Sequence, residues 1–158
     1  MTQHTRRILP LLLFFLLCTQ LLAQTFTARV IRVLDGDTIA IVSDGTQIRV
    51  RLAECDAPES DQPFGSAATQ FTASLVSGRS VTVHVTDKDK YGRSIAHITT
   101  DQGLDLSTEL IRAGLAWWYR QYSRNLQLGF LETQARDAHR GLWIDPNPTP
   151  PWVWRHAR

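Results

Sequence analysis

Hydrophobic and polar residues alternate along much of the first two thirds of the chain, which is typical of half-buried strands. Five such runs are rich in Val, Ile and Thr, and they span residues 26–34, 38–42, 47–53, 80–86 and 94–99. Asp44-Gly45 separates the second run from the third, and this dipeptide is a strong hairpin signal. In the third run Ile48, Val50 and Leu52 share one face, so the arginines between them face away from the core.

Helical spacing appears in three other segments, and each of them ends near a glycine. They are residues 65–75, a segment capped by Asp105 and closed by Gly114, and residues 126–139. Five strands with a helix between the third and fourth favour a small closed barrel. We predict an α+β protein, a five-stranded OB-fold barrel with three α-helices. The proline-rich stretch 146–151 should form neither helix nor inner strand, and Trp152 and Trp154 would anchor it as a strap.

The start of the chain has the pattern of a secretory signal peptide. Arg6 and Arg7 precede the apolar run 8–18, which is shorter than the roughly 20 residues that a membrane span needs. Cleavage after Ala23 would export the protein to the periplasm or the medium, without a stable membrane span. Retention as an anchor and a lipid-modified start at Cys18 remain alternatives. The predicted organisation is a signal peptide at 1–23, one domain at 24–145 and a Pro/Trp-rich tail at 146–158, with a monomer as the default.

Charge and cysteine content limit how the chain could attract nucleic acid and whether it could form a disulfide. The full chain has 17 Lys and Arg against 15 Asp and Glu, and without Arg6 and Arg7 the two totals are equal. A global basic field therefore cannot attract nucleic acid, and any such function must come from local placement. Cys55 is the one cysteine left after residue 23, which excludes an intramolecular disulfide there and favours a small buried side chain.

Candidate chemistry is concentrated at two acidic segments, Asp35-Gly36-Asp37-Thr38 and Cys55-Asp56-Ala57-Pro58-Glu59. Either segment alone is more typical of a turn or loop. Together they place carboxylates at the ends of neighbouring strands, and carboxylates with carbonyls and water are what hard divalent cations bind. Arg51 and Arg93 could stabilise the charge that develops on phosphoryl oxygens. A carboxylate nearby could orient or deprotonate an attacking water.

The order of these motifs resembles the staphylococcal nuclease-like, or thermonuclease, family over roughly residues 27–143. The matching pieces are Val33-Leu34-Asp35-Gly36-Asp37-Thr38, Val50-Arg51-Leu52, Asp56-Ala57-Pro58-Glu59, Pro63-Phe64-Gly65, Asp89-Lys90-Tyr91-Gly92-Arg93, Gly114-Leu115-Ala116 and Gly141-Leu142-Trp143. Several independent motifs in one order are a much more specific signal than any of them alone.

The resemblance implies a calcium-dependent endonuclease that hydrolyses DNA and RNA without sugar specificity. Water would attack phosphorus, and cleavage of the 5′ P–O bond would leave 3′-phosphate products. It assigns the calcium ligands to Asp37, Asp56 and the backbone carbonyl of Ala57, the catalytic roles to Arg51, Glu59 and Arg93, and substrate contacts to Tyr91 and Tyr122. Because a guanidinium hardly deprotonates, Arg93 is expected to stabilise charge.

Two other classes of protein share parts of this pattern. OB-fold barrels also bind oligonucleotides without cutting them, so a non-catalytic nucleic-acid-binding module is the main alternative. An envelope-associated structural protein would explain the signal-like start but not the acidic and arginine set, whose completeness favours the enzyme. The run Trp117-Trp118-Tyr119 is predicted either to fill the core or to stack on unpaired bases.

Overall fold

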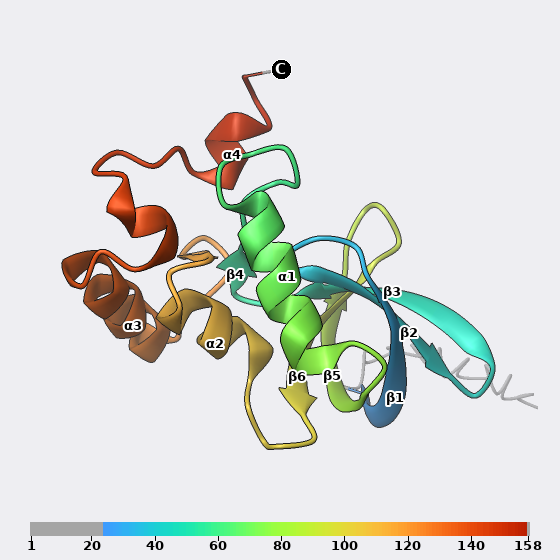
Figure 1. Cartoon of the computed structure of the whole chain (residues 1–158). Helices are drawn as coiled ribbons and strands as arrows, with labels where there is room; N and C mark the ends of the chain where they lie inside the picture. The colour runs from blue at the N-terminus through green and yellow to red at the C-terminus, as the bar shows by residue number, and fades with distance from the viewer. Residues whose placement is uncertain (1–23, 158) are drawn as a thin grey trace, which may run out of the picture.

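The computed structural model describes residues 24–157, so the predicted signal peptide lies outside the described residues. Five strands form a closed barrel in the order β1-β2-β3-β6-β5 (Figure 1). They are β1 (Gln24–Val33), β2 (Thr38–Ser43), β3 (Thr46–Leu52), β5 (Ser80–Lys88) and β6 (Ser94–Thr100). Parallel pairing of β3 with β6 closes the barrel, with Val50 opposite Ser94, and the other strand pairs are antiparallel. The predicted barrel is confirmed.

The helices predicted from the sequence are present as α1 (Gly65–Val76), α2 (Leu106–Arg112) and α3 (Leu126–Asp137). The side chain of Asp105 accepts a hydrogen bond of 2.8 Å from the Thr108 N–H, which confirms the predicted cap of α2. Four short elements were not predicted. They are β4 (Cys55–Asp56) and β7 (Trp117–Trp118), which form a two-stranded sheet, the 3₁₀ helix η1 (Gly141–Ile144), and α4 (Pro151–Trp154). Residues 24–157 therefore hold four α-helices rather than three, and none of them has the length and apolar character needed to cross a membrane.

The C-terminal tail corrects one prediction. Proline was expected to prevent a helix through residue 151, but Pro151 is the first residue of α4. Proline is well tolerated there because the first turn of a helix does not need its N–H. Trp152 does anchor the tail, since its ring stacks on Tyr119 with the planes 3° apart and the centroids 5.6 Å apart. On the other side Gln62 Nε2 donates to the Thr149 carbonyl at 2.5 Å, so α4 lies beside the loop before α1 (Figure 1).

The barrel interior is filled by the apolar faces that the alternation predicts. Val30, Ile39, Ile41, Val50 and Ile98 are completely buried. Leu106, Leu110 and Ile111 of α2 belong to the same buried cluster. Cys55 belongs to the same cluster, as predicted, and its burial raises the pKa of the thiol.

The ends of α2 and α3 meet backbone to backbone at two glycines with positive φ. A Cβ at Gly114 would lie 2.3 Å from the Arg140 carbonyl oxygen, and a Cβ at Gly141 would lie 2.3 Å from the Gly114 oxygen. That Gly114 oxygen also accepts a hydrogen bond from the Leu142 N–H at 2.9 Å. Any side chain at either glycine would force the two helix ends apart.

Candidate active site

Two carboxylates from separate loops come together at one end of the barrel. Asp37 lies just before β2 and Asp56 ends β4, and their exposed fractions are only 6% and 0%. The Asp37 carboxylate is held from both sides, because Oδ2 accepts from the Ala57 N–H at 2.6 Å and Oδ1 from the Thr38 hydroxyl at 3.2 Å. The two acidic segments of the sequence therefore form one site. Ala57 contributes its amide hydrogen to Asp37 here.

Arg51 lies between these carboxylates. Pairing of β2 with β3 puts Arg51 opposite Thr38, next to Asp37. Its Nη1 is 2.5 Å from Asp37 Oδ2, and its Nη2 donates to Asp56 Oδ1 at 2.6 Å. Burial lowers the pKa of Arg51, but the two carboxylates more than offset this and raise the pKa above its ordinary value. Arg51 is therefore a fixed positive charge at the barrel end.

The carboxylates themselves lack sufficient compensating charge. Burial raises the pKa of Asp37 to about 6, although Arg51 opposes this. Burial also raises the pKa of Asp56, against the effects of a hydrogen bond from Arg155 and the charge of Arg51. Two buried acids with raised pKa values would be stabilised by further positive charge, and their oxygen donors suit a hard divalent cation.

A metal at this position would have few protein ligands. Across residues 24–157 no three His, Cys, Asp or Glu side chains are grouped as a metal site. A cation held by Asp37 and Asp56 would need backbone carbonyls and water to complete its shell. The residues thus fit a weakly held oxygen-ligated cation and do not fit a tight one.

Glu59 stands at the rim of the same cluster, in the loop between β4 and α1. Its N–H donates to Gln62 Oε1 at 3.1 Å, which fixes the loop. Its carboxylate accepts a hydrogen bond of 2.6 Å from Nη1 of Arg155, the residue that follows α4. The same guanidinium reaches both oxygens of Asp56, at 3.2 Å and 2.8 Å. Sequence reasoning did not identify Arg155, although the two tryptophans predicted that its segment packs down.

The structure does not bring the remaining predicted site residues into this cluster. Arg93 precedes β6 and binds Asp89 through its Nε at 2.7 Å and its backbone N–H at 3.0 Å. Tyr91, in the same loop, is 74% exposed. Tyr122 is 67% exposed in the loop before α3, with its ring edge-on to Tyr119. The roles of these three residues remain predictions.

An aromatic cleft of about 580 Å³ opens beside the cluster, between β7, α3 and the tail. Trp117 borders the cleft but is only 3% exposed, because it packs edge-on to Trp143 in the core. Trp118 and Tyr119 are half-buried and do line it, with the Arg120 guanidinium 5.1 Å from the Trp118 ring centre. Of the two alternatives predicted for this run, the core position applies to Trp117. Trp118 and Tyr119 face the cleft, where stacking on a base is sterically open to them.

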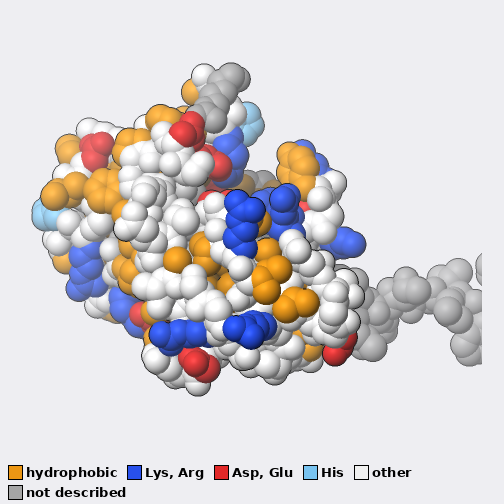
Figure 2. Space-filling model, turned by 45° about the vertical axis from the view of Figure 1, so that its right-hand side comes forward, with side chains coloured by type: hydrophobic (Ala, Val, Ile, Leu, Met, Phe, Trp, Pro, Cys, Tyr) orange, Lys and Arg blue, Asp and Glu red, His pale blue; other side chains and the backbone are white. Residues whose placement is uncertain are grey.

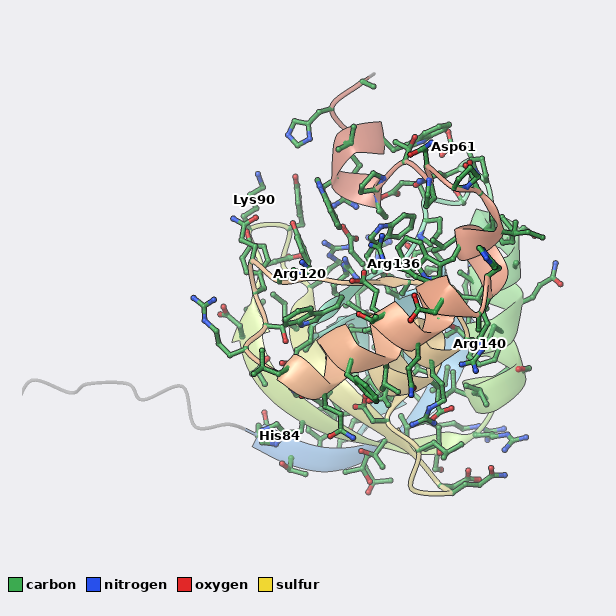
Figure 3. All side chains as sticks on the ribbon, turned by 90° about the vertical axis from the view of Figure 1, so that its left-hand side faces the viewer. Asp61, His84, Lys90, Arg120, Arg136 and Arg140 are labelled. Carbon is green, nitrogen blue, oxygen red and sulfur yellow. The ribbon has the colours of Figure 1, made fainter. Side chains whose placement is uncertain are left out.

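Lys and Arg side chains gather on one face of the molecule. Figure 2 shows Lys and Arg side chains gathered around a hollow, with acidic side chains on its wall. In Figure 3, Arg120 and Arg136 lie on the side of α3 that faces α4, and Lys90 stands at the tip of the β5–β6 loop across from α4. A formally neutral chain beyond residue 23 can thus still concentrate positive charge locally.

Comparison with known proteins identifies the family. Residues 49–145 match the family described as staphylococcal nuclease homologue. The chain is 40% identical over 153 residues to an "uncharacterized endonuclease" of Escherichia coli O157:H7, covering 97% of this chain and 99% of that one. It is 39% identical over 142 residues to a "micrococcal nuclease" of Shigella flexneri, covering 84% and 82%. The chain belongs to the staphylococcal nuclease family, and these relatives support nuclease activity on nucleic acids.

The matched segment contains most of the candidate site but not all of it. Arg51, Asp56, Glu59 and Arg93 lie within residues 49–145. Asp37 precedes that segment, and Arg155 follows it. The alignment with the Escherichia coli O157:H7 relative extends over nearly the whole chain.

Proposed function

We propose that this protein is a calcium-dependent endonuclease that hydrolyses phosphodiester bonds in both DNA and RNA. The observation that carries the proposal is the placement of Arg51 between Asp37 and Asp56, with the Glu59 carboxylate at the rim of the same cluster. These are the groups that phosphodiester hydrolysis needs: oxygen ligands for a cation, a fixed positive charge and a carboxylate for water. Family membership and the names of the relatives support the same reaction.

The chain's own residues have distinct tasks in this reaction. A divalent cation on Asp37 and Asp56 would act as a Lewis acid on the phosphoryl group. Arg51, already oriented by the barrel, binds a phosphate oxygen and stabilises the charge that develops on it. Glu59 orients the attacking water and accepts its proton. The 5′ P–O bond then breaks and the leaving 5′ oxygen takes a proton from solvent water, which leaves a 3′-phosphate on one product and a 5′-hydroxyl on the other.

Arg93 completes the site in this proposal, after leaving Asp89. Its side chain is 27% exposed and stands in the β5–β6 loop, so it can reach a bound phosphate without disturbing the barrel. Tyr91 and Tyr122, both exposed, would contact the sugar or base next to the cut bond. The aromatic cleft offers a further surface on which an unpaired base can stack, which is worth roughly 1–3 kcal/mol per base.

We propose calcium as the cation because the site offers only two carboxylate ligands. Calcium sites of extracellular modules bind at roughly 10⁻⁴–10⁻³ M, which suits two carboxylates completed by carbonyls and water. Such a site would be filled outside the cytoplasm and largely empty within it. We accordingly propose that residues 1–23 direct export, so that activity depends on the compartment.

The test is a cleavage assay on purified protein beginning near residue 24. Plasmid, single-stranded DNA and RNA are each incubated with calcium, with magnesium and with a chelator. We expect calcium-dependent cleavage of all three, and Glu59→Gln should lower the rate by about 10²–10⁴-fold because the water loses its base.

Glu109→Gln is the matched control, since Glu109 is an acid on α2 that pairs with Arg112. It should cleave at the wild-type rate. Undiminished cleavage by Glu59→Gln would exclude the assigned role. Folded wild-type protein that retards oligonucleotides but cuts none of them with any metal would instead establish a binding module.

A further inference from the structure

The strongest unexplained contact in the molecule is made by Arg155. Its guanidinium forks onto Asp56, with Nη1 3.2 Å from Oδ1 and Nη2 2.8 Å from Oδ2, and Nη1 is also 2.6 Å from Glu59 Oε1. Arg51 Nη2 binds the same Oδ1 from the other side. Both oxygens of a wholly buried carboxylate are therefore engaged by guanidinium groups. A metal ion that binds Asp56 therefore competes with these groups for the same two oxygens.

The two guanidinium groups differ in how readily they can leave. The Arg51 side chain is 12% exposed and rises from a central barrel strand, so moving it would leave buried carboxylates without their partner. The Arg155 side chain is 39% exposed and follows a helix of only four residues. A partly exposed arginine can return to water at small cost. Arg155 is thus the group that gives way.

The tail is built to hold Arg155 in place and also to release it. Trp152 stacks on Tyr119, and Gln62 binds the Thr149 carbonyl, so α4 is anchored on both sides of the cluster. The helix α4 is itself a single turn, and short elements of this kind open locally at lower free energy than the core. Docking of the tail therefore places Arg155 on Asp56 and Glu59 but remains reversible.

Charge balance favours such an exchange. Asp35, Asp37, Asp56 and Glu59 supply four negative charges, and Arg51 with Arg155 supplies two positive ones, which leaves two negative charges. With a divalent cation in place of Arg155 one negative charge remains, so the exchange brings the cluster closer to neutrality.

We propose that Arg155 is a tethered cation that competes with the divalent metal for Asp56 and Glu59, so that the docked tail holds the nuclease inactive until metal displaces it. The proposal rests on the proposed function, because it presumes that these carboxylates bind metal. By linkage, docking weakens metal binding by the same factor by which metal weakens docking. The tail thereby raises the metal concentration at which the enzyme becomes active.

Titration calorimetry with calcium chloride on the substrate-free protein gives a direct test. Arg155→Ala should bind calcium roughly tenfold more tightly than wild type, because the competing charge-assisted hydrogen bonds are gone. Arg155→Lys should fall between the two, since an ammonium cannot fork onto both oxygens of Asp56. Arg29→Ala, which removes the same charge from an exposed position on β1, should match wild type.

Hydrogen exchange of the tail provides a readout that does not depend on activity. Calcium should speed amide exchange in residues 150–157 of wild type, and it should leave exchange unchanged in Asp37→Asn, which loses a metal ligand. Tail exchange that ignores calcium while calcium binds would overturn the proposal.

The remaining outcomes separate this proposal from the proposed function. If wild type and Arg155→Ala bind calcium equally and wild type cleaves with calcium, the competition is absent but the enzyme stands. If neither protein binds calcium or cleaves, both ideas fail. If Arg155→Ala keeps the wild-type calcium affinity but has a raised KM for oligonucleotide, Arg155 is a substrate contact, and the tethered cation is excluded.

Discussion

Two arginine–aspartate pairs of this protein occupy contrasting surroundings, although the family resemblance assigns both arginines to the substrate phosphate. Arg51 comes from a barrel strand with paired neighbours, and its partner Asp56 is wholly buried. Arg93 comes from the loop between β5 and β6, where its side chain is 27% exposed and Asp89 is 15% exposed. One half of the candidate site is thus assembled by folding itself. The other half is a surface loop, whose Arg93 would have to leave Asp89 to bind a phosphate as proposed.

The difference in burial between the two pairs predicts which substitutions affect folding stability and which affect catalysis. A buried charge that loses its partner is strongly destabilising, whereas an exposed pair contributes little. Changes at the barrel end should therefore alter folding and catalysis together, and changes in the loop should alter catalysis alone.

The largest effect is expected at Arg51. Arg51→Ala leaves two buried carboxylates without their shared partner, so the free energy of unfolding should fall by about 3–5 kcal/mol. Cleavage should be lost as well. Urea unfolding in a chelator measures the first effect, with Arg49→Ala as the control, because Arg49 is exposed on the same strand and should change stability by no more than about 0.5 kcal/mol. If Arg51→Ala had wild-type stability, the barrel half of the site would contribute no more to folding than the loop half, and the contrast drawn above would be wrong.

An intermediate effect is expected from the titration of Asp37. Because folding raises the pKa of this carboxyl to about 6, the folded protein holds its proton at pH values where the unfolded chain has released it. The stability contribution is complete below about pH 4 and is lost as the pH rises through about 6. Without metal, wild type should therefore lose at most about 3 kcal/mol relative to Asp37→Asn over this range.

Urea unfolding of both proteins at several pH values from 4 to 7.5 measures this difference. Adding calcium should restore the free energy of unfolding of wild type at the upper end of this pH range, because the cation stabilises the ionised Asp37 carboxylate. A difference that stays constant with pH would mean that Asp37 is not destabilised by burial.

The smallest change in stability is expected at Arg93, together with a clear change in rate. Arg93→Gln breaks a half-buried pair on a surface loop, so the free energy of unfolding should change by about 1 kcal/mol or less. The cleavage rate should fall by about 10²–10³-fold, the usual effect of removing one donor that stabilises transition-state charge. Parallel kinetics and urea unfolding would check both statements. A large loss of stability with little loss of rate would give Arg93 a structural role.

Much of the fold follows from local patterns in the chain. Alternation with a period of two predicts the five barrel strands, and Asp105 marks the start of α2 as predicted. The closeness of Asp37 and Asp56 also follows, since each segment adjoins the end of a neighbouring strand. These features are set by residues near one another in sequence or by strand pairing.

Other features depend on contacts that no local pattern contains. β4 and β7 have two residues each and α4 has one turn, too few for a period to be visible. Arg155 meets Asp56 across 99 positions of the chain, and its segment is rich in proline rather than in any recognisable active-site motif. The Asp89–Arg93 pair was missed for a different reason: the sequence suggests a phosphate contact for Arg93 and does not show its partner in the absence of substrate.

The contact between Gly114 and Gly141 has a consequence for how relatives of this protein are recognised. Gly-Leu-Ala and Gly-Leu-Trp are two of the motifs that mark the family resemblance, yet the glycines in them mark a place where two backbones touch. A homologue in which Asp37 or Glu59 had been replaced could keep both motifs, and it would still be recognised as a member of the family. Membership of the family is thus marked partly by glycines that hold two backbones together. Under the proposed function, the acids and arginines at the barrel end would instead decide whether a family member is an active nuclease.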